Sequence, residues 1–431
     1  MKKPNATDKR DLFIYQVYVR NHTEAGTFQA LINDLDRIRA LGVDMIYLLP
    51  VNLIGAKNRK GTLGSPYAIK DYKTINPELG TYDDFKALIN ACHERKMKVM
   101  LDIVFNHTSP DATLLETNPE FYYKENGAFK NRIGDWWDVT DFDFSKSEAL
   151  WETLIDVLVH YTNLGVDGYR FDVASLLPLA FLEAARQTID AINPQTIWLS
   201  ESVHGHFLKE VRDRGFEAHS EAELFTVFDM AYDYDAHPYF EAYLKNEAPL
   251  APYVAWLQKQ EEIYPKDYVK LRNLENHDFG RIAAMVHENK NKLKQWHAFN
   301  FFNKGATMIF SGSETFNPHH PDLFNKDTID FNREDHSAFF KRLNQITRGS
   351  LFTAGIYHIA KADDKDVIIG RYENAVSQVT GIFNVALETG TITIDLPDGR
   401  YENAIDGTEV TIKNNRLVLK QDPVILFADP R

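Results

Sequence analysis

The sequence predicts an α/β protein, a (β/α)8 barrel with a short excursion domain after its third strand and a C-terminal antiparallel β domain. Three observations support this prediction. Short apolar, β-branched runs alternate with longer amphipathic stretches up to about residue 349, a pattern typical of repeated βα units around a parallel sheet. Four of these runs end in conspicuous polar residues, at the strand ends where such barrels carry their active sites. From residue 350 the pattern changes to short alternating runs broken by turn residues, which indicates an antiparallel sheet.

The apolar runs provide the eight strands that a closed barrel of this kind needs. They are Phe13–Val17, Met45–Leu49, Lys98–Phe105, Gly165–Phe171, Ile197–Ser200, Leu224–Asp229, Val269–Leu274 and Thr307–Ser311. The amphipathic stretches between or after them are predicted helices, among them Phe28–Leu41, Tyr82–Lys96, Lys146–Tyr161, Tyr253–Ile263, Asn289–Phe302 and Asp335–Arg348.

The predicted domains follow from these changes of pattern. We expect residues 1–106 and 145–349 to form the barrel, and residues 350–431 to form a C-terminal β-sandwich. Residues 107–144 show no clear helix and contain many aromatic and polar residues, so we interpret them as a small excursion domain beside the cleft.

The C-terminal domain has two interpretations. Its tyrosines Tyr357, Tyr372 and Tyr401 are candidates for a surface that stacks on sugar rings. The alternative is that the domain only packs against the barrel.

Composition limits the classes of partner. A net charge of −14 argues against nucleic acid or an anionic membrane as the main partner, because both bind basic patches. No run approaches the roughly 20 apolar residues of a membrane span, and no apolar stretch typical of a secretory signal precedes Leu12. We therefore expect a cytoplasmic protein. The lone Cys92 excludes an internal disulfide, and the sequence carries no signal for an oligomeric state.

Three carboxylates at predicted strand ends carry the chemical information. Asp172 ends Gly-Tyr-Arg-Phe-Asp, Glu201 ends Ile-Trp-Leu-Ser-Glu, and Asp278 ends Asn-His-Asp. Retaining cleavage of a glycosidic bond needs two such groups, one as nucleophile and one as acid and base. Arg170 lies two positions before Asp172 and therefore on the same face of the strand. We expect its charge to lower the pKa of Asp172 and keep this nucleophile ionised.

The remaining roles follow from the neighbourhoods of the residues. Glu201 follows an apolar run, where partial desolvation and a second carboxylate favour a raised pKa and the role of acid and base. Asp278, beside His277, is suited to orienting sugar hydroxyls and stabilising positive charge, and His107 can donate a hydrogen bond to the same sugar. Taken singly, an Arg-x-Asp on a strand is more often a structural ion pair, and an Asn-His-Asp is more often a turn. Their order along the chain favours the catalytic interpretation.

These segments together resemble the conserved segments of the α-amylase family, glycoside hydrolase family thirteen. The matching segments are Asp102-Ile-Val-Phe-Asn-His107, Gly168-Tyr-Arg-Phe-Asp172, Ile197-Trp-Leu-Ser-Glu201 and Asn276-His-Asp278, with support from Leu41–Pro50, Asp71-Tyr72 and Pro77–Thr81. The resemblance implies Asp172 as nucleophile, Glu201 as acid and base, and Asp278 as transition-state stabiliser. It also implies that Tyr67, as a stacking aromatic, and His107, Arg170 and His277 surround the sugar at the cleavage site.

The chain departs from the family pattern at two places. Ser175-Leu176 replace the Lys-His pair that typically binds sugar on the leaving-group side, and Ser65-Pro66 replace a His-Gly before Tyr67. The chemistry needs no cofactor. The resemblance allows a structural calcium, with Asn106 and Asp141 at two ligand positions, but calcium takes six to eight oxygens and the other ligands are not identified. Asp141 alternatively caps the following helix.

The sequence thus favours a retaining α-glycosidase that cleaves α-1,4 bonds in malto-oligosaccharides. The alternatives are a glucanotransferase, in which a sugar hydroxyl replaces water, and an α-glucosidase acting on other α-glucosides. A more distant alternative is a non-catalytic carbohydrate-binding homologue, although such homologues usually lack one or more of the three carboxylates.

Overall fold

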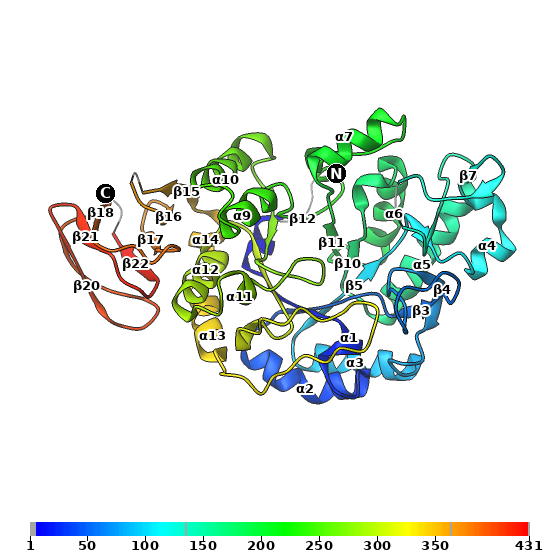
Figure 1. The fold of residues 1–431 in the computed structure, drawn as a ribbon, viewed down its shortest axis with the longest axis horizontal. Helices are drawn as coiled ribbons and strands as arrows, with labels where there is room; N and C mark the ends of the chain where they lie inside the picture. The colour runs from blue at the N-terminus through cyan, green and yellow to red at the C-terminus, as the bar shows by residue number, and fades with distance from the viewer. Residues whose placement is uncertain (1–5, 134–135, 363, 430–431) are drawn as a thin grey trace.

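The computed structural model describes residues 6–133, 136–362 and 364–429. Eight parallel strands close into a barrel in the order β1-β14-β13-β12-β11-β10-β5-β2 (Figure 1). Their bounds are β1 Phe13–Val17, β2 Met45–Leu48, β5 Lys98–Ile103, β10 Gly168–Phe171, β11 Ile197–Ser200, β12 Met230–Tyr232, β13 Lys270–Arg272 and β14 Ala306–Phe310. The predicted (β/α)8 fold class is confirmed, and strand-forming residues occupy seven of the eight predicted places.

The sixth predicted strand is wrong. Leu224–Asp229 lies at the end of helix α8 (Glu221–Leu224) and in the turn after it, and the barrel strand β12 begins only at Met230. The helix forms because Ser220 and Glu223 make a capping box, in which each side chain accepts a hydrogen bond from the other residue's backbone N–H. This S-x-x-E signal outweighs the apolar run.

The helices cover the outside of the barrel, as the apolar periodicity predicts. Those before residue 349, outside the excursion, are α1 Val19–His22, α2 Phe28–Ala40, α3 Tyr82–Glu94, α5 Glu148–Leu164, α6 Leu179–Ile192, α7 Gly205–Asp213, α8, α9 His237–Leu244, α10 Ala251–Ile263, α11 Ile282–Met285, α12 Lys290–Phe302 and α13 Ser337–Ile346. A short helix α14, Ser350–Ala354, then leads to the C-terminal strands. Short 3₁₀ turns lie at Ala6–Asp11, Ala174–Leu176 and Ser313–Thr315. Gly165, at φ 109°, ends α5 in the left-handed conformation that glycine adopts without strain.

The excursion after β5 is short and irregular. It contains a pair β6 His107–Thr108 with β9 Thr140–Asp141, a hairpin β7 Lys124–Glu125 with β8 Ala128–Phe129, and a 3₁₀ turn Pro119–Phe121. It also contains one short helix, α4 Thr113–Thr117, which the sequence pattern did not indicate. The hairpin β3 Asn52–Ile54 and β4 Ile69–Ile75 lies beside it, at the right of Figure 1.

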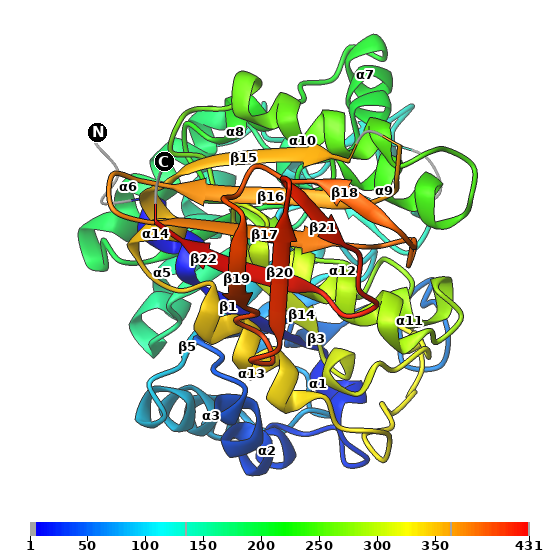
Figure 2. The ribbon, with the colours of Figure 1, turned by 90° about the vertical axis from the view of Figure 1, so that its left-hand side faces the viewer.

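The C-terminal residues form two four-stranded antiparallel sheets, which face the viewer in Figure 2. They lie at the opposite end of the molecule from the excursion (Figure 1). One sheet is β15 Ile356–Lys361, β16 Ile368–Glu373, β17 Gln378–Phe383 and β22 Val424–Ala428, and the other is β18 Thr391–Thr393, β21 Arg416–Val418, β20 Glu409–Lys413 and β19 Gly399–Glu402. Apolar residues from both sheets share one core, as in a sandwich.

The C-terminal tyrosines do not form an exposed stacking surface, so that candidate is wrong. Tyr357 and Tyr372 are buried at 8% and 2% exposure, and Tyr357 Oη donates to Asn303 Oδ1 after helix α12 at 2.9 Å. Tyr401 Oη donates to Pro397 O, in the loop just before its own strand. The first two rings instead join the barrel core. In the part of the chain that the structure describes, no helix is long and apolar enough to cross a membrane.

Candidate active site

The guanidinium of Arg170 is the centre of the site. It is fully buried on β10, and Arg170 and Asp172 point the same way because they are two residues apart. Nη1 donates to Asp102 Oδ1 at 2.7 Å and to Asp172 Oδ1 at 2.8 Å, while Nη2 lies 2.8 Å from Glu201 Oε1. One cation therefore brings three carboxyl groups from three neighbouring strands to adjacent positions.

The backbone fixes the two carboxylates that follow β10 and β11. The Asp172 N–H donates to Ile103 O at 2.9 Å and the Glu201 N–H to Phe171 O at 3.1 Å, so the barrel ladder continues through both residues. Glu201 Oε2 accepts a hydrogen bond from the Val173 N–H at 2.7 Å. Val173 is β-branched and has φ 38°, a left-handed conformation of the kind that stores about 1–3 kcal/mol of strain at functional sites.

The pKa of Asp172 differs from the sequence-based expectation. Burial raises this pKa well above its ordinary value; the charge of Arg170 opposes the rise, and the charges of Glu201, Asp102 and Asp278 add to it. Arg170 acts in the expected direction, but its effect is smaller than that of burial, so the expected net lowering is wrong. Because the carboxyls of Asp172 and Asp102 interact with each other, their titrations are linked.

Tyr67 and His277 form the wall beside Asp102. Their rings stack at 5.5 Å with an angle of 16°, and Tyr67 Oη lies 2.5 Å from His277 Nε2 and 3.0 Å from Asp102 Oδ2. Burial lowers the pKa of His277 to about 3, which leaves its imidazole neutral. Asp278 Oδ2 is 3.2 Å from His277 Nε2, and its side chain is 40% exposed toward the open space above.

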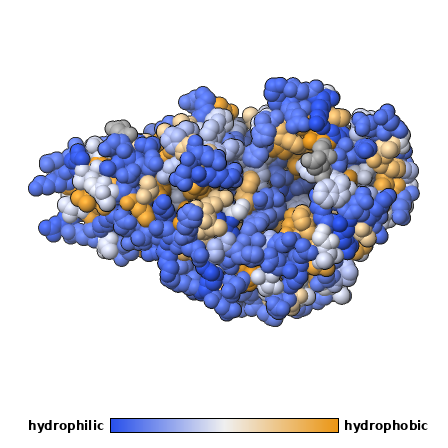
Figure 3. Space-filling model, in the orientation of Figure 1, coloured by the Kyte–Doolittle hydropathy of each residue, from blue (hydrophilic) through white to orange (hydrophobic). Residues whose placement is uncertain are grey.

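These side chains line one pocket of about 320 Å³. It collects Tyr67, His107, Asp172, Glu201, His277 and Asp278, with Arg170 beneath them; His107 Nε2 lies 3.9 Å from Asp172 Oδ2. Every predicted catalytic and sugar-contacting residue is thus brought together. The face drawn in Figure 3 is mostly hydrophilic and is hollowed on the side where Figure 1 labels the excursion.

The sequence reasoning missed several residues of the site. Asp102 was part of a predicted segment but had no assigned role, although a carboxyl inside an apolar run needs a partner. It is fully buried, accepts a hydrogen bond from Tyr47 Oη at 2.8 Å, and has its pKa raised by burial to about 6. Other pocket residues without an assigned role are Lys60, Ser65, Trp136, Asp138, Val139, Val173, Leu323 and Phe324. Leu323 and Phe324 come from a loop with no sequence signal.

Comparison with known families agrees with this geometry. The family model described as alpha amylase, catalytic domain, matches residues 13–137 and 133–345, and the model for the bacterial alpha amylase C-terminal domain matches residues 358–426. The chain belongs to the α-amylase family.

Individual relatives are consistent with the family. A crystal structure of an alpha-amylase from Lactobacillus plantarum has 40% identity and a TM-score of 0.94, with 98% of this chain and 100% of that chain covered. A noncanonic maltogenic alpha-amylase from Thermotoga neapolitana has 29% identity and a TM-score of 0.87, covering 98% and 100%.

Curated sequences match over shorter shares of their length. An α-1,4-glucan:maltose-1-phosphate maltosyltransferase of Pseudomonas aeruginosa is 32% identical over 44% of this chain and 32% of its own length. An intracellular maltogenic amylase of Bacillus subtilis is 25% identical over 80% of this chain and 59% of its own length. The chain thus spans about a third to three fifths of the length of these relatives.

Ser175 and Leu176, which replace the Lys-His pair of many α-amylases, have structural roles. Ser175 Oγ accepts from the Val203 N–H at 3.1 Å, and Ser175 O accepts from the His219 N–H at 2.8 Å. Leu176 packs in a small apolar cluster with Ile133 of the excursion. These two positions therefore tie the loop after β10 to its neighbours and offer no cationic or imidazole group to a sugar.

The two calcium-ligand positions hold an arginine between them. Arg132 Nη2 donates to Asn106 Oδ1 at 2.9 Å, and Arg132 Nε and its backbone N–H both donate to Asp141 Oδ2, at 3.1 Å and 2.9 Å. Within the described residues, no group of three or more His, Cys, Asp or Glu side chains is arranged around a common ion position. Asn106 Oδ1 and Asp141 Oδ2 are thus bonded to the Arg132 cation, and because this charge occupies the space between them, the arrangement does not fit calcium.

Proposed function

We propose that this chain is a retaining α-glycoside hydrolase that cleaves α-1,4-glucosidic bonds in malto-oligosaccharides. The observation that carries the proposal is the contact of one guanidinium with both Asp172 and Glu201 at the floor of a pocket that Asp278 borders. Paired carboxyls at a sugar-sized pocket suit double displacement at an anomeric carbon. Names of relatives, maltogenic amylase among them, point to the same class of substrate.

In this mechanism the ionised form of Asp172, paired with Arg170, attacks the anomeric carbon, while Glu201 gives its proton to the departing glycosidic oxygen. Glu201 then removes a proton from water, which attacks the glycosyl ester and releases the sugar. Asp278 stabilises the positive charge that develops in both transition states. Tyr67, His107 and the neutral His277 contact the sugar at the cleavage site, and Arg170 holds the two reacting carboxyls in place.

A glucanotransferase is the second candidate, because relatives named as maltosyltransferases match part of this chain. It would use the same three carboxylates, with a sugar hydroxyl in place of water. We propose a cytoplasmic location, in keeping with the relative named intracellular.

The test is the product distribution from maltoheptaose, measured by chromatography for the wild type beside Glu201→Gln. Shorter sugars alone, absent in the variant, support a hydrolase. Products longer than the substrate indicate the transferase. No turnover would refute the α-1,4-glucan assignment and direct the assay to sucrose, trehalose and isomaltose. A non-catalytic binder would bind maltoheptaose with the same affinity as the wild type and as the Asp172→Asn variant. Neither protein would then convert the sugar to products.

A further inference from the structure

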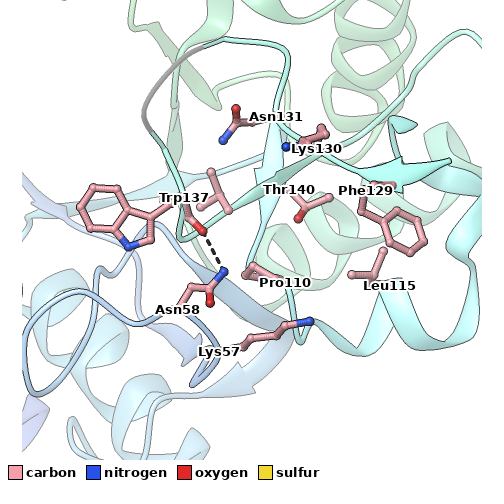
Figure 4. Close-up of a pocket in the computed structure, with 11 residues that line it drawn as sticks. Lys57, Asn58, Pro110, Leu115, Phe129, Lys130, Asn131, Trp137 and Thr140 are labelled. Carbon is pink, nitrogen blue, oxygen red and sulfur yellow. Dashed lines mark hydrogen bonds between the residues drawn. The ribbon is translucent and has the colours of Figure 1, made fainter. Parts of the chain in front are cut away.

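A second and larger hollow lies beside the catalytic pocket, on the excursion. Its volume is about 910 Å³, within the upper range of ligand sites. Val139 lines both this hollow and the catalytic pocket. Figure 4 shows Trp137 at one end and Phe129 with Leu115 at the other, with Asn131, Lys130 and Thr140 between them.

The two aromatic rings are unusually exposed for their size. Trp137 is 62% exposed and Phe129 38%. The backbone beneath Trp137 is nevertheless fixed, because Asn58 Nδ2 donates to Trp137 O at 3.1 Å and Asn131 Nδ2 donates to Trp136 O at 2.6 Å. An indole that is held in place and more than half exposed is a ready surface for a ligand with an apolar face.

Trp137 lines the second hollow, and its neighbours line the catalytic pocket. Lys60 lines the catalytic pocket, its Nζ lies 4.6 Å from the centre of the Trp137 ring, and it pairs with Asp138 at 2.8 Å. Trp136 and Asp138, which flank Trp137 in sequence, both line the catalytic pocket. A chain bound at the carboxylates can therefore continue across Trp137 into the second hollow.

We propose that this hollow binds the distal sugar units of an α-glucan whose other end occupies the catalytic pocket. The inference rests on the proposed function and adds a preference for longer chains. Sugar rings present apolar faces, which Trp137 and Phe129 can stack on. Their hydroxyls match the amides of Asn58 and Asn131 and the ammonium of Lys57, all at the walls of the hollow.

The test compares the affinity of short and long chains by calorimetry, in the full chain carrying Asp172→Asn to prevent turnover. Adding Trp137→Ala is expected to weaken maltoheptaose binding about tenfold and to leave maltotriose binding unchanged. Phe129→Ala should weaken maltoheptaose in the same selective way. Tyr82→Ala is the matched control, since Tyr82 is 40% exposed on α3, outside both hollows, and it should alter neither affinity.

Equal losses for both sugars, or no loss for maltoheptaose, would overturn the proposal, and so would a failure of maltoheptaose to bind at all. Turnover assays separate this result from the proposed function. Length-selective binding that depends on Trp137, without turnover by the wild type, would support the hollow and refute the hydrolase. Turnover by the wild type, with a length preference that Trp137→Ala does not change, would support the hydrolase and refute sugar binding in the hollow.

Discussion

At the scale of single residues, the pocket gathers four carboxyl groups, three of which contact one guanidinium. Asp102, Asp172 and Glu201 contact Arg170 directly, and Asp278 lies above them. Burial raises the pKa of Asp172 and of Asp102, so these two carboxyls hold their protons more tightly than exposed ones. Asp172 and Glu201 differ in their second contact: only Glu201 accepts the Val173 N–H.

The proposed roles of Asp172 and Glu201 can be separated by the leaving group. Glu201→Gln should lower turnover of maltoheptaose by about 10²–10⁴-fold, the usual contribution of a general acid. The loss should be much smaller with α-maltosyl fluoride plus azide, because fluoride departs without a proton and azide attacks without a base. Asp172→Asn should lose activity on both substrates. Steady-state rates on the two substrates check this, and an equal loss by Glu201→Gln on both would refute its role.

At the scale of elements, the excursion is held to the barrel by Arg132. Its guanidinium links Asn106, after β5, to Asp141 on β9, and Asp141 is 1% exposed at its side chain. Removing one partner of a buried ion pair lowers the free energy of unfolding by about 3–5 kcal/mol, because the other charge is left unpaired. Arg132→Ala should therefore lower the thermal midpoint clearly, and Arg132→Lys, which keeps the charge but not the fork, should lower it less. Chelator should leave the wild-type midpoint unchanged. A large fall on adding chelator would contradict the assignment of Arg132 to this position.

The charged cluster around β12 and β13 predicts a pH dependence of stability. Glu221 pairs with the buried Lys270, which also lies 2.7 Å from Asp235, and burial raises the pKa of Glu221 from 4.5 to about 8. The folded state therefore holds a proton on Glu221 that the unfolded chain releases above pH 4.5, so this contribution to stability is lost as pH rises toward 8. Urea unfolding measures the free energy of unfolding at pH 5 and at pH 8. This free energy should fall less between the two pH values in Glu221→Gln than in the wild type. The same decrease in both would exclude Glu221 as its source.

At the scale of the whole molecule, the C-terminal sandwich meets the barrel through a close contact with α12. A Cβ on Gly370 would lie 2.7 Å from the ring of Phe302, closer than packed atoms allow. Gly370→Ala should thus force a shift between β16 and α12 and destabilise the protein by about 1–3 kcal/mol. Gly205→Ala is the control, since nothing lies within 4 Å of the added methyl. Denaturant unfolding measures both, and an equal effect would contradict tight packing here.

The sequence was sufficient for the barrel and the convergence of the site because both follow from local patterns. Short apolar runs locate the strands and helical periodicity locates the helices, and polar residues at strand ends meet at one rim of a parallel barrel. The start of β12 was predicted too early because two local signals compete there. The capping box of Ser220 and Glu223 begins a helix that extends into the apolar run. The net pKa of Asp172 and the position of Arg132 depend on burial and on contacts between distant segments, which no local pattern reveals.

The central claim is that Asp172 forms a covalent bond to the sugar at this pocket. A slow α-glucosyl substrate, 5-fluoro-α-glucosyl fluoride, should accumulate the glycosyl-enzyme, and digestion with mass spectrometry should place the label on the peptide that contains Asp172. Glu201→Gln should still become labelled, because the fluoride needs no acid, and Asp172→Asn should not. Label on another carboxylate, or labelling that persists in Asp172→Asn, would contradict the account.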